Sequence, residues 1–298
     1  MTTFSRLVLG TVQLGLPYGI ANTSGRPDHE QALAIVRAAV ENGVLEFDTA
    51  QGYGDSERVL GRCFQQLNCA ARVRVVSKPD TKLDLRSPIA VRSAVNRSLD
   101  GLQISALEGM LLHREEFLDD WKQGVGQIFA DLVKDGLLRR VGVSVYSPQA
   151  ALRALQTEGI DMVQIPGNIF DRRFERAGVY TLAERLGKTL YVRSVFLQGL
   201  VFHTPTTLPE HMAFAGDSVR RFNALVAKWD LTPQQLSLGY IRAAAPNAKV
   251  LFGAETDAQV LDNLASWSTT LSDECFQDIQ ATFDNVQERV LNPALWSE

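Results

Sequence analysis

The stretch of the chain richest in potential chemistry places Asp48 and Tyr53 five residues apart, within the sequence DTAQGYGDSE at residues 48–57. The largely apolar run at 44–47 leads directly into Asp48, and glycines flank Tyr53. Such a pattern is typical of a buried strand that ends and opens into a loop. In barrels of alternating strands and helices, these loops at the carboxyl ends of strands carry the catalytic side chains. The stretch therefore predicts a carboxylate and a phenol side by side in a functional site.

Three further polar residues stand at matching points of the next apolar runs. Lys78, His113 and Ser144 each end such a run; starting from Asp48, the separations are 30, 35 and 31 residues by subtraction of residue numbers. One strand with its crossover helix takes ~30 residues or more, so these residues fall at equivalent points of consecutive strands. In a parallel barrel such points converge on one rim. The spacing predicts that Asp48, Tyr53, Lys78 and His113 share one site.

These side chains are suited to proton transfer to an oxygen that is becoming negative. Tyrosine has an ordinary pKa near ~10, so it is a poor acid at neutral pH unless its anion is stabilised. The Lys78 ammonium can stabilise that anion, and Asp48 can supply the counter-charge that a buried lysine needs. A neutral His113 can hydrogen-bond a substrate oxygen and orient it. None of these groups donates hydride, so a redox reaction at this site requires a cofactor.

Composition narrows the classes of function. The 298 residues are 45% hydrophobic, which is ordinary for a globular protein, and the net charge of −4 with scattered Lys and Arg does not indicate nucleic-acid binding. No apolar run approaches the ~20 residues of a membrane span. The start enters a strand almost at once, so no signal peptide is expected. Cys63, Cys69 and Cys275 are odd in number and lack metal spacing, which favours a reducing, cytoplasmic location.

Eight short, nearly continuous apolar runs alternate along the chain with amphipathic segments of helical period. This alternation predicts a parallel sheet with right-handed crossovers, and eight units in 298 residues favour a closed (β/α)8 TIM barrel over an open sheet. The expected strands are 7–9, 44–47, 73–76, 107–112, 141–143, 162–165, 190–192 and 250–252. The expected helices include 29–42, 87–102, 119–135, 148–158, 174–186, 217–229 and 233–244.

We expect one domain over residues 1–298, because no linker divides the chain. No G-x-G-x-x-G stands at a strand–helix junction, which argues against a Rossmann domain. The glycines at 124 and 126 lie inside an expected helix and lack a third. Two expected helices precede the last strand, so one of them is an addition to the regular alternation of one strand and one helix. Segment 199–217 is expected to be a long loop that forms a flap over one end of the barrel.

Taken together, these motifs resemble the aldo-keto reductase superfamily. The match includes the stretch at 48–57, the strand-end Lys78 and His113, Gly10–Thr11, VGVS at 141–144, VQIPGN at 163–168 and Gly253–Ala254. Residues 10–22 also resemble a bacterial subgroup linked with sugar and surface-polysaccharide metabolism. The resemblance implies metal-free reduction of a small-molecule aldehyde, ketone or sugar to an alcohol, or the reverse reaction, with NADP(H) or NAD(H).

The resemblance also implies roles for single residues. Tyr53 is the general acid and base, Lys78 and Asp48 tune it, and His113 positions the carbonyl. Arg193 lies over the nicotinamide ring. The implied cofactor-binding residues are Gly10, Thr11, Asp48, Ser144, Gln164, Arg193, Ser194, Phe196, Gln198, Gly253, Glu255, Thr256, Gln259 and Asn263.

Three residues depart from the pattern of that superfamily. Val145 stands where Asn is common, which removes one contact to the cofactor amide, and Gly167 replaces a larger residue, which widens the pocket. Glu255 stands near the point where NADP-dependent members carry a basic or hydroxyl residue. A carboxylate there repels a 2′-phosphate and can accept a hydrogen bond from a ribose hydroxyl, which tilts the preference toward NAD(H).

Two other functions remain open from the sequence. The chain could be a nicotinamide-sensing regulatory module with little turnover, which tight cofactor binding without catalysis would reveal. The chain could also be a metal-dependent barrel hydrolase or an aldolase. The sequence shows no cluster of metal ligands for a hydrolase, and an aldolase would need Lys78 to form a Schiff base. For the carbonyl-reducing enzyme, the expected partner is a small-molecule carbonyl or sugar substrate, with no nucleic acid or membrane, and the protein is expected to be a monomer or a small homo-oligomer.

Overall fold

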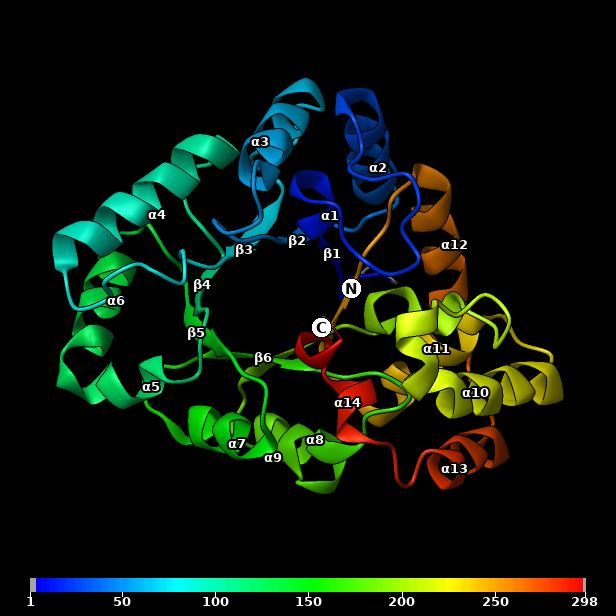
Figure 1. Cartoon of the computed structure of the whole chain (residues 1–298). Helices are drawn as coiled ribbons and strands as arrows, with labels where there is room; N and C mark the ends of the chain where they lie inside the picture. Colours follow the sequence, from blue (N-terminus) through cyan, green and yellow to red (C-terminus); the bar gives the residue numbers. More distant parts are fainter. Residues whose placement is uncertain (1–3, 297–298) are drawn as a thin grey trace.

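The computed structural model describes residues 4–296, and its eight parallel strands close into a barrel (Figure 1). Each strand pairs with the next in chain order, and β8 pairs back with β1. This arrangement confirms the predicted (β/α)8 barrel. The strands are β1 (Leu7–Gly10), β2 (Glu46–Asp48), β3 (Arg74–Ser77), β4 (Gly109–Leu112), β5 (Val141–Ser144), β6 (Met162–Pro166), β7 (Thr189–Arg193) and β8 (Lys249–Phe252).

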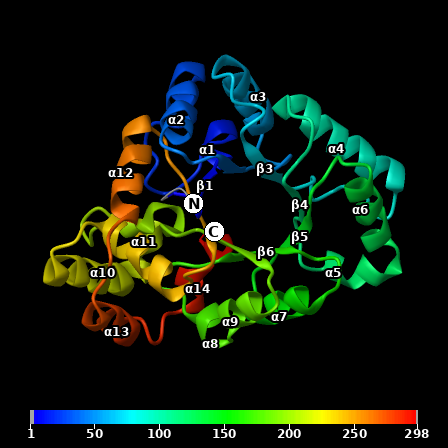
Figure 2. The ribbon, with the colours of Figure 1, turned by 180° about the vertical axis from the view of Figure 1, so that it is seen from behind.

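Helices form a ring around the strands in both views (Figures 1 and 2). The short helix α14 lies inward of this ring, nearer the barrel axis than α13. The helices are α1 (Val12–Gly15), α2 (His29–Glu41), α3 (Ser56–Gln66), α4 (Pro88–Leu102), α5 (Phe117–Asp120), α6 (Val125–Lys134), α7 (Pro148–Gln156), α8 (Arg173–Arg176), α9 (Val179–Arg185), α10 (Gly216–Trp229), α11 (Pro233–Ala244), α12 (Asp257–Trp267), α13 (Asp273–Thr282) and α14 (Glu288–Leu291). The 3₁₀ helices are η1 (Trp121–Gln123), η2 (Leu197–Phe202), η3 (Glu210–Ala215) and η4 (Pro293–Leu295).

Hydroxyl–proline pairs set the starts of three helices. Ser87, Ser147 and Thr232 precede α4, α7 and α11, and each side-chain oxygen accepts a hydrogen bond from a backbone N–H in the first turn. A proline follows each of them at the first helical position, where its missing N–H costs nothing and its φ suits the helix. These local signals explain why the helix starts expected at residues 87, 148 and 233 fall within one residue of the observed ones.

Strand β2 shows how the barrel positions its polar groups. Its three residues alternate, so that Glu46 and Asp48 share one face while Phe47 points to the other. Phe47 packs edge-on against Phe64 of α3, with ring centroids 5.0 Å apart. At the amino end of the strand, the buried Glu46 accepts a 2.6 Å hydrogen bond from the Tyr191 hydroxyl. Glu46 therefore belongs to the stabilising end of the barrel, and Asp48 to the opposite rim.

The barrel interior is a packed core rather than a channel. Gly142 is required there, because a Cβ at this position would lie 2.2 Å from the Met162 carbonyl oxygen. Side chains from alternate strands fill the centre, as in other barrels of this type. The central cluster consists of Val8, Val76, Leu111, Met162, Tyr191 and Leu251.

Glycines interrupt two of the expected helices. The helix expected at 119–135 is broken at Gly124, whose φ of 115° separates η1 from α6. The helix expected at 174–186 is broken at Gly178, whose φ of 73° separates α8 from α9. Glycine adopts such left-handed conformations without steric cost, and here it ends a helix that the apolar period alone would continue. Segment 199–217, expected to be a long loop, instead contains most of η2 and all of η3.

Residues 4–296 lack the features of two other kinds of protein. No helix in this part of the chain is both long and apolar enough to cross a membrane. No group of three or more acidic, histidine or cysteine side chains there is arranged to hold a metal ion.

Candidate active site

A buried ion pair lies at the centre of the candidate site. Asp48 is the last residue of β2, and Lys78 directly follows the neighbouring strand β3. The Lys78 ammonium donates to both Asp48 carboxylate oxygens, at 2.6 and 2.8 Å, and to the Thr49 carbonyl oxygen at 3.1 Å. The Lys78 side chain is only 1% exposed. Burial lowers the pKa of Lys78, while the adjacent Asp48 carboxylate opposes this effect.

Tyr53 and His113 complete the cluster that the spacing predicted. The Lys78 Nζ lies 5.3 Å from the centroid of the Tyr53 ring. The rings of Tyr53 and His113 meet edge to face, with their centroids 6.3 Å apart. The ends of three adjacent strands, β2 to β4, therefore bring the carboxylate, phenol, ammonium and imidazole together on one rim.

The phenol differs in its electrostatics from the sequence-based expectation. Burial, reinforced by the negative charge of Asp48, raises the pKa of Tyr53 well above its ordinary value, and Arg193 opposes the shift. The charge of Lys78 is matched by the Asp48 carboxylate at hydrogen-bond distance, so the pair acts on the phenol as a dipole and not as a single positive charge. Tyr53 therefore carries a proton at neutral pH, as an unperturbed tyrosine does, and the raised pKa makes the buried phenol a weaker acid than a free one.

His113 is neutral under ordinary conditions. Burial and the positive charge of Lys78 lower its pKa from 6.5 to about 4. The buried Nδ1 of His113 has no hydrogen-bond partner among residues 4–296. A neutral imidazole keeps one donor and one acceptor nitrogen, so it can hydrogen-bond a substrate oxygen without carrying charge.

This shift has a consequence for stability. Between pH 6.5 and about 4 the unfolded chain protonates His113 while the folded protein does not. The free energy of unfolding therefore falls as the pH drops through this window. We expect His113→Gln to show a weaker loss of stability from pH 6.5 to pH 4.5 than the parent protein, measured by urea unfolding. Equal slopes for the two proteins would contradict the lowered pKa.

Asp48 has a second partner that sequence spacing did not reveal. Gln164 in β6 donates from its side-chain nitrogen to Asp48 Oδ2 at 2.8 Å. Ser144, the last residue of β5, donates to the side-chain oxygen of Gln164 at 3.3 Å. Both residues were expected to hold the amide group of a nicotinamide. In the structure they contact each other at the barrel rim that carries Asp48. Gln164 additionally fixes the carboxylate that pairs with Lys78.

Buried hydroxyl groups fasten the loop that carries Tyr53. Ser56 donates to the Thr11 carbonyl oxygen at 2.8 Å and lies 3.0 Å from the Thr49 hydroxyl. The Thr11 hydroxyl donates to the Asp48 carbonyl oxygen at 2.8 Å. All of these residues are essentially inaccessible to solvent. Thr11 therefore holds the end of β2 in place, alongside its expected role near the cofactor.

The segment after β7 has an unusual backbone. Ser194, Leu197 and Gln198 all have positive φ values, of 63°, 46° and 53°. Side chains rarely adopt this conformation, and it clusters at ligand-binding sites where the surroundings enforce it. Arg193, at the end of β7, stacks its guanidinium 4.5 Å from the centroid of the Tyr146 ring. Phe196, which lies in the same segment, is buried.

The residues expected at the adenine end lie together around the start of α12. The Thr256 hydroxyl caps this helix by accepting from the Gln259 N–H, and Gln259 Oε1 accepts from the Glu255 N–H at 2.7 Å. Asn263 in α12 donates to the Gly253 carbonyl oxygen at 3.4 Å. Burial raises the pKa of Glu255. Side chains at the start of α12 thus accept hydrogen bonds from two backbone N–H groups in this region. The Glu255 carboxylate lies beside them.

Unpartnered polar atoms on this rim fit a bound nucleotide cofactor. Among residues 4–296, Gln13 Oε1 beyond β1, Asn168 Nδ2 beyond β6 and Arg193 Nη2 at the end of β7 are buried without hydrogen-bond partners. A buried polar group without a partner costs about 1–3 kcal/mol, so such atoms mark places where a polar ligand belongs. Gly10 lies on the same rim, at the end of β1.

Sequence reasoning missed three residues of this rim. Tyr146 stacks beneath Arg193, and Glu115 accepts a 2.8 Å hydrogen bond from the Tyr146 N–H. Burial raises the pKa of Tyr18, and the nearby Gln198 side chain opposes this shift. Two of these residues had a signal in the sequence: Tyr146 follows the strand-end Ser144 by two residues, and Tyr18 lies in the stretch at 10–22 that resembles a bacterial subgroup. Glu115 lies in a loop without a period or motif to mark it.

Comparisons with known proteins identify a family with this architecture. The model of the aldo/keto reductase family matches residues 6–284. Probable aldo-keto reductase 1 from Glycine max is 25% identical over 88% of this chain and 82% of its own length. The NADH-specific methylglyoxal reductase of Escherichia coli (strain K12) is 26% identical over 91% of this chain and 92% of its own. The holo structure of an aldo-keto reductase from Bacillus halodurans has a TM-score of 0.74 at 23% identity, covering 93% of this chain and 91% of that one.

Proposed function

The chain belongs to the aldo/keto reductase family, and from this premise we propose that it reduces the carbonyl group of a small molecule with a nicotinamide cofactor. The observation that carries the proposal is the cluster of Asp48, Tyr53, Lys78 and His113 at the carboxyl ends of β2 to β4. The family consists of NAD(P)H-dependent carbonyl oxidoreductases, which sets the reaction class. The proton donor, the cofactor preference and the substrate are our proposals.

In the proposed reaction Tyr53 delivers a proton to the carbonyl oxygen. Its phenol carries a proton at neutral pH, as an unperturbed tyrosine does, and burial raises its pKa further. The neutral His113 hydrogen-bonds the same oxygen and orients it. The ion pair of Lys78 and Asp48 supplies a fixed dipole where charge develops and holds the loop that carries the phenol. The reduced nicotinamide supplies the hydride when the cofactor is bound.

The cofactor would be held on the opposite part of the rim. Ser144 and Gln164 would contact its amide, and Arg193 the ring. The segment with Ser194, Phe196 and Gln198 would cover its centre, near Gly10 and Thr11. The residues around the start of α12 would hold the adenosine end: Gly253, Glu255, Thr256, Gln259 and Asn263. We propose that the catalytic cluster and the cofactor site belong to a single domain over residues 1–298. We also propose that the protein acts in a reducing compartment such as the cytoplasm, where its free cysteines remain reduced.

We expect NADH to bind more tightly than NADPH. The Glu255 carboxylate and the self-capped start of α12 disfavour an additional phosphate there, while the carboxylate can accept from a ribose hydroxyl. The NADH-specific relative from Escherichia coli supports this preference. Replacing Glu255 by Gln should strengthen NADPH binding by about tenfold or less, since a partly exposed like charge costs on the order of 1 kcal/mol. Titration with each cofactor measures both effects.

A carbonyl-reduction assay on aldehydes, ketones and sugars with each cofactor completes the test of function. Turnover with NADH is the expected result. A clear preference of the parent protein for NADPH would contradict the assignment of Glu255 while leaving the reaction class intact. Tight cofactor binding without turnover on any carbonyl compound would instead favour a regulatory binding module.

A further inference from the structure

The loop that carries Tyr53 continues the pairing between β2 and β3 beyond the ends of both strands. The Thr49 N–H donates to the Val76 carbonyl oxygen at 2.9 Å, and the Gln51 N–H donates to the Lys78 carbonyl oxygen at 2.9 Å. The step of two residues on each side extends the parallel register of the two strands. Gln51 is therefore the last residue in register with the segment of Lys78 before the chain turns toward Tyr53.

The side chain of Gln51 joins three parts of the structure. Its Oε1 accepts from the Asp80 N–H at 3.1 Å. Its Nε2 donates to the Ala94 carbonyl oxygen at 2.7 Å and to the Ser98 hydroxyl oxygen at 2.9 Å. Asp80 lies three residues beyond β3, and both acceptors lie in α4. The amide thus ties its own loop to the segment after β3 and to the helix outside it.

An amide at this position satisfies all of these partners at once. The Asp80 N–H can only donate and the Ala94 carbonyl can only accept, so one acceptor and one donor are needed on the same side chain. The two bonds of Nε2 match its two hydrogens, and their partner Ser98 is fully buried. The Gln51 side chain therefore has no spare donor for a substrate or a cofactor, and it can act on the reaction only through the groups that it holds.

The helix that receives Gln51 is itself fixed in place. Helices α3 and α4 lie side by side (Figure 1). They approach so closely that a Cβ at Gly61 would lie 2.1 Å from the Gly101 carbonyl oxygen. The hydroxyl of Ser77, the last residue of β3, donates at 2.6 Å to the Glu57 carboxylate in α3. The two helices and the end of β3 therefore form a rigid frame against which the side chain is anchored.

The turn that follows Gln51 presents the phenol. The Tyr53 N–H donates to the Ala50 carbonyl oxygen at 3.0 Å, which closes a turn that contains Gln51. Beyond this turn, Gly15 of α1 packs so closely that a Cβ there would lie 1.7 Å from the Tyr53 carbonyl oxygen. A displacement of Gln51 would therefore move the phenol relative to Lys78, whose Nζ lies 5.3 Å from the ring centroid.

We propose that Gln51 is a positioning residue for proton delivery, because its side chain holds the Tyr53 loop in register with the segment of Lys78. The inference rests on the proposed carbonyl reduction, and it names the group that keeps the proton donor in place. A misplacement of about 1 Å can cost a reaction on the order of 10²-fold, so loss of these contacts should be measurable as a rate.

The test removes the side-chain contacts and keeps the length of the side chain. Gln51→Met retains the backbone bond to Lys78 and loses the three bonds of the amide. We expect kcat for the most rapidly reduced aldehyde of the carbonyl panel to fall by about tenfold or more, while KM and the dissociation constant of NADH change less than about twofold. Gln51→Asn keeps the amide but is shorter by one methylene, so it should lower kcat as well and gives the same comparison should Gln51→Met not fold.

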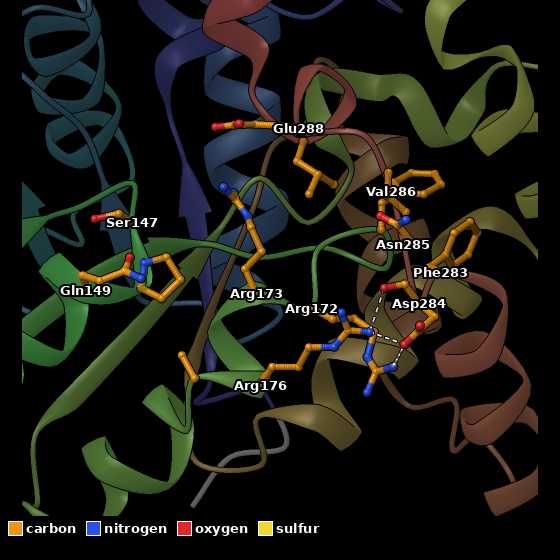
Figure 3. A pocket seen from close by; sticks show the side chains of 14 residues that line it. Ser147, Gln149, Arg172, Arg173, Arg176, Phe283, Asp284, Asn285, Val286 and Glu288 are labelled. Atoms are coloured by element: carbon orange, nitrogen blue, oxygen red, sulfur yellow. Dashed lines mark hydrogen bonds and ion pairs between the residues drawn. The ribbon is translucent and has the colours of Figure 1, made fainter.

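Gln280 offers a matched control on the part of the helix ring that lies across the barrel from α3 and α4 (Figure 1). Its Nε2 in α13 donates to Glu175 Oε1 in α8 at 2.6 Å, so it also joins elements far apart in the sequence. Its carbonyl oxygen accepts from Arg172, which lines the pocket shown in Figure 3. None of the residues lining that pocket is assigned to catalysis or to the cofactor. Gln280→Met should lower the unfolding free energy without changing kcat.

Combination with Tyr53→Phe shows whether Gln51 acts through the phenol. In that background Gln51→Met should lower the residual turnover less than about twofold, because the group that it positions is already missing. An equal fall in both backgrounds would overturn the proposal, as would a higher KM or weaker NADH binding in place of a lower kcat. The proposal also fails if Gln280→Met lowers kcat as much as Gln51→Met does.

Hydrogen exchange of the full-length protein provides a readout that needs no turnover. We expect the backbone amides of residues 49–53 to exchange about tenfold faster or more in Gln51→Met, and at the parent rate in Gln280→Met. Unchanged exchange in Gln51→Met would overturn the proposal. If exchange rises and the parent protein reduces no carbonyl compound, Gln51 holds the loop and the proposed function fails. If the parent protein reduces aldehydes and Gln51→Met is equally active, the proposed function stands and the role of Gln51 fails.

Discussion

Replacing Tyr53 by Phe should abolish carbonyl reduction while leaving cofactor binding unchanged. The substitution removes only the hydroxyl group, because the ring retains its contacts with Lys78 and His113. A positioned proton donor contributes roughly 10²- to 10⁴-fold to a rate, so turnover should fall by about that factor. Steady-state kinetics measures the loss, and fluorescence titration with NADH measures cofactor binding.

The unfolding free energy of the Tyr53→Phe variant serves as its control. No hydrogen bond of the Tyr53 hydroxyl to another described residue holds the fold, so we expect the stability to change by less than about 1 kcal/mol. Near-normal turnover by a folded variant would show that another group delivers the proton. A joint loss of turnover and of cofactor binding would point to a collapse of the site and not to missing chemistry.

Replacing Lys78 by Met should cost both activity and stability. Lys78 is buried and supplies two hydrogen bonds to Asp48, so its removal leaves the carboxylate unpaired in the protein interior apart from Gln164. Breaking a buried ion pair in this way costs about 3–5 kcal/mol. We expect urea unfolding to show a loss of this size, together with a large fall in kcat.

The double variant Lys78→Met with Asp48→Asn separates the two effects. Neutralising the carboxylate removes the uncompensated charge, so much of the lost stability should return. Activity should not return, because the dipole beside the phenol is still missing. Recovery of turnover in the double variant would refute a catalytic role for the ion pair. A single variant as stable as the parent would show that Asp48 does not depend on Lys78.

Much of the framework followed from the sequence, because buried parallel strands are short apolar runs with clear ends. Asp48, Lys78 and His113 could be placed on one rim because one strand–helix unit has a nearly constant length. Their positions at the ends of β2, β3 and β4 agree with that spacing. The helix starts at Ser87 and Ser147 followed from local capping chemistry, which acts within a few residues.

Other features depend on contacts that no local pattern encodes. The breaks at Gly124 and Gly178 were missed because an apolar period continues across a glycine that adopts a positive φ. Gln164 and Asp48 are 116 residues apart, and only closure of the barrel brings their side chains together. The raised pKa of Tyr53 could not be anticipated, because the sequence identifies Lys78 as a neighbour but does not reveal how deeply the phenol is buried.

The most direct measurement of the central claim follows a deuterium label from NADH into product. The parent protein is incubated with NADH that carries deuterium at both C4 positions of the nicotinamide and with an aldehyde substrate, and the alcohol is analysed by mass spectrometry. We predict one deuterium on the former carbonyl carbon, with label transfer strongly reduced in the Tyr53→Phe variant. Alcohol formed without the label, or no alcohol from a protein that binds NADH tightly, would contradict carbonyl reduction at this site.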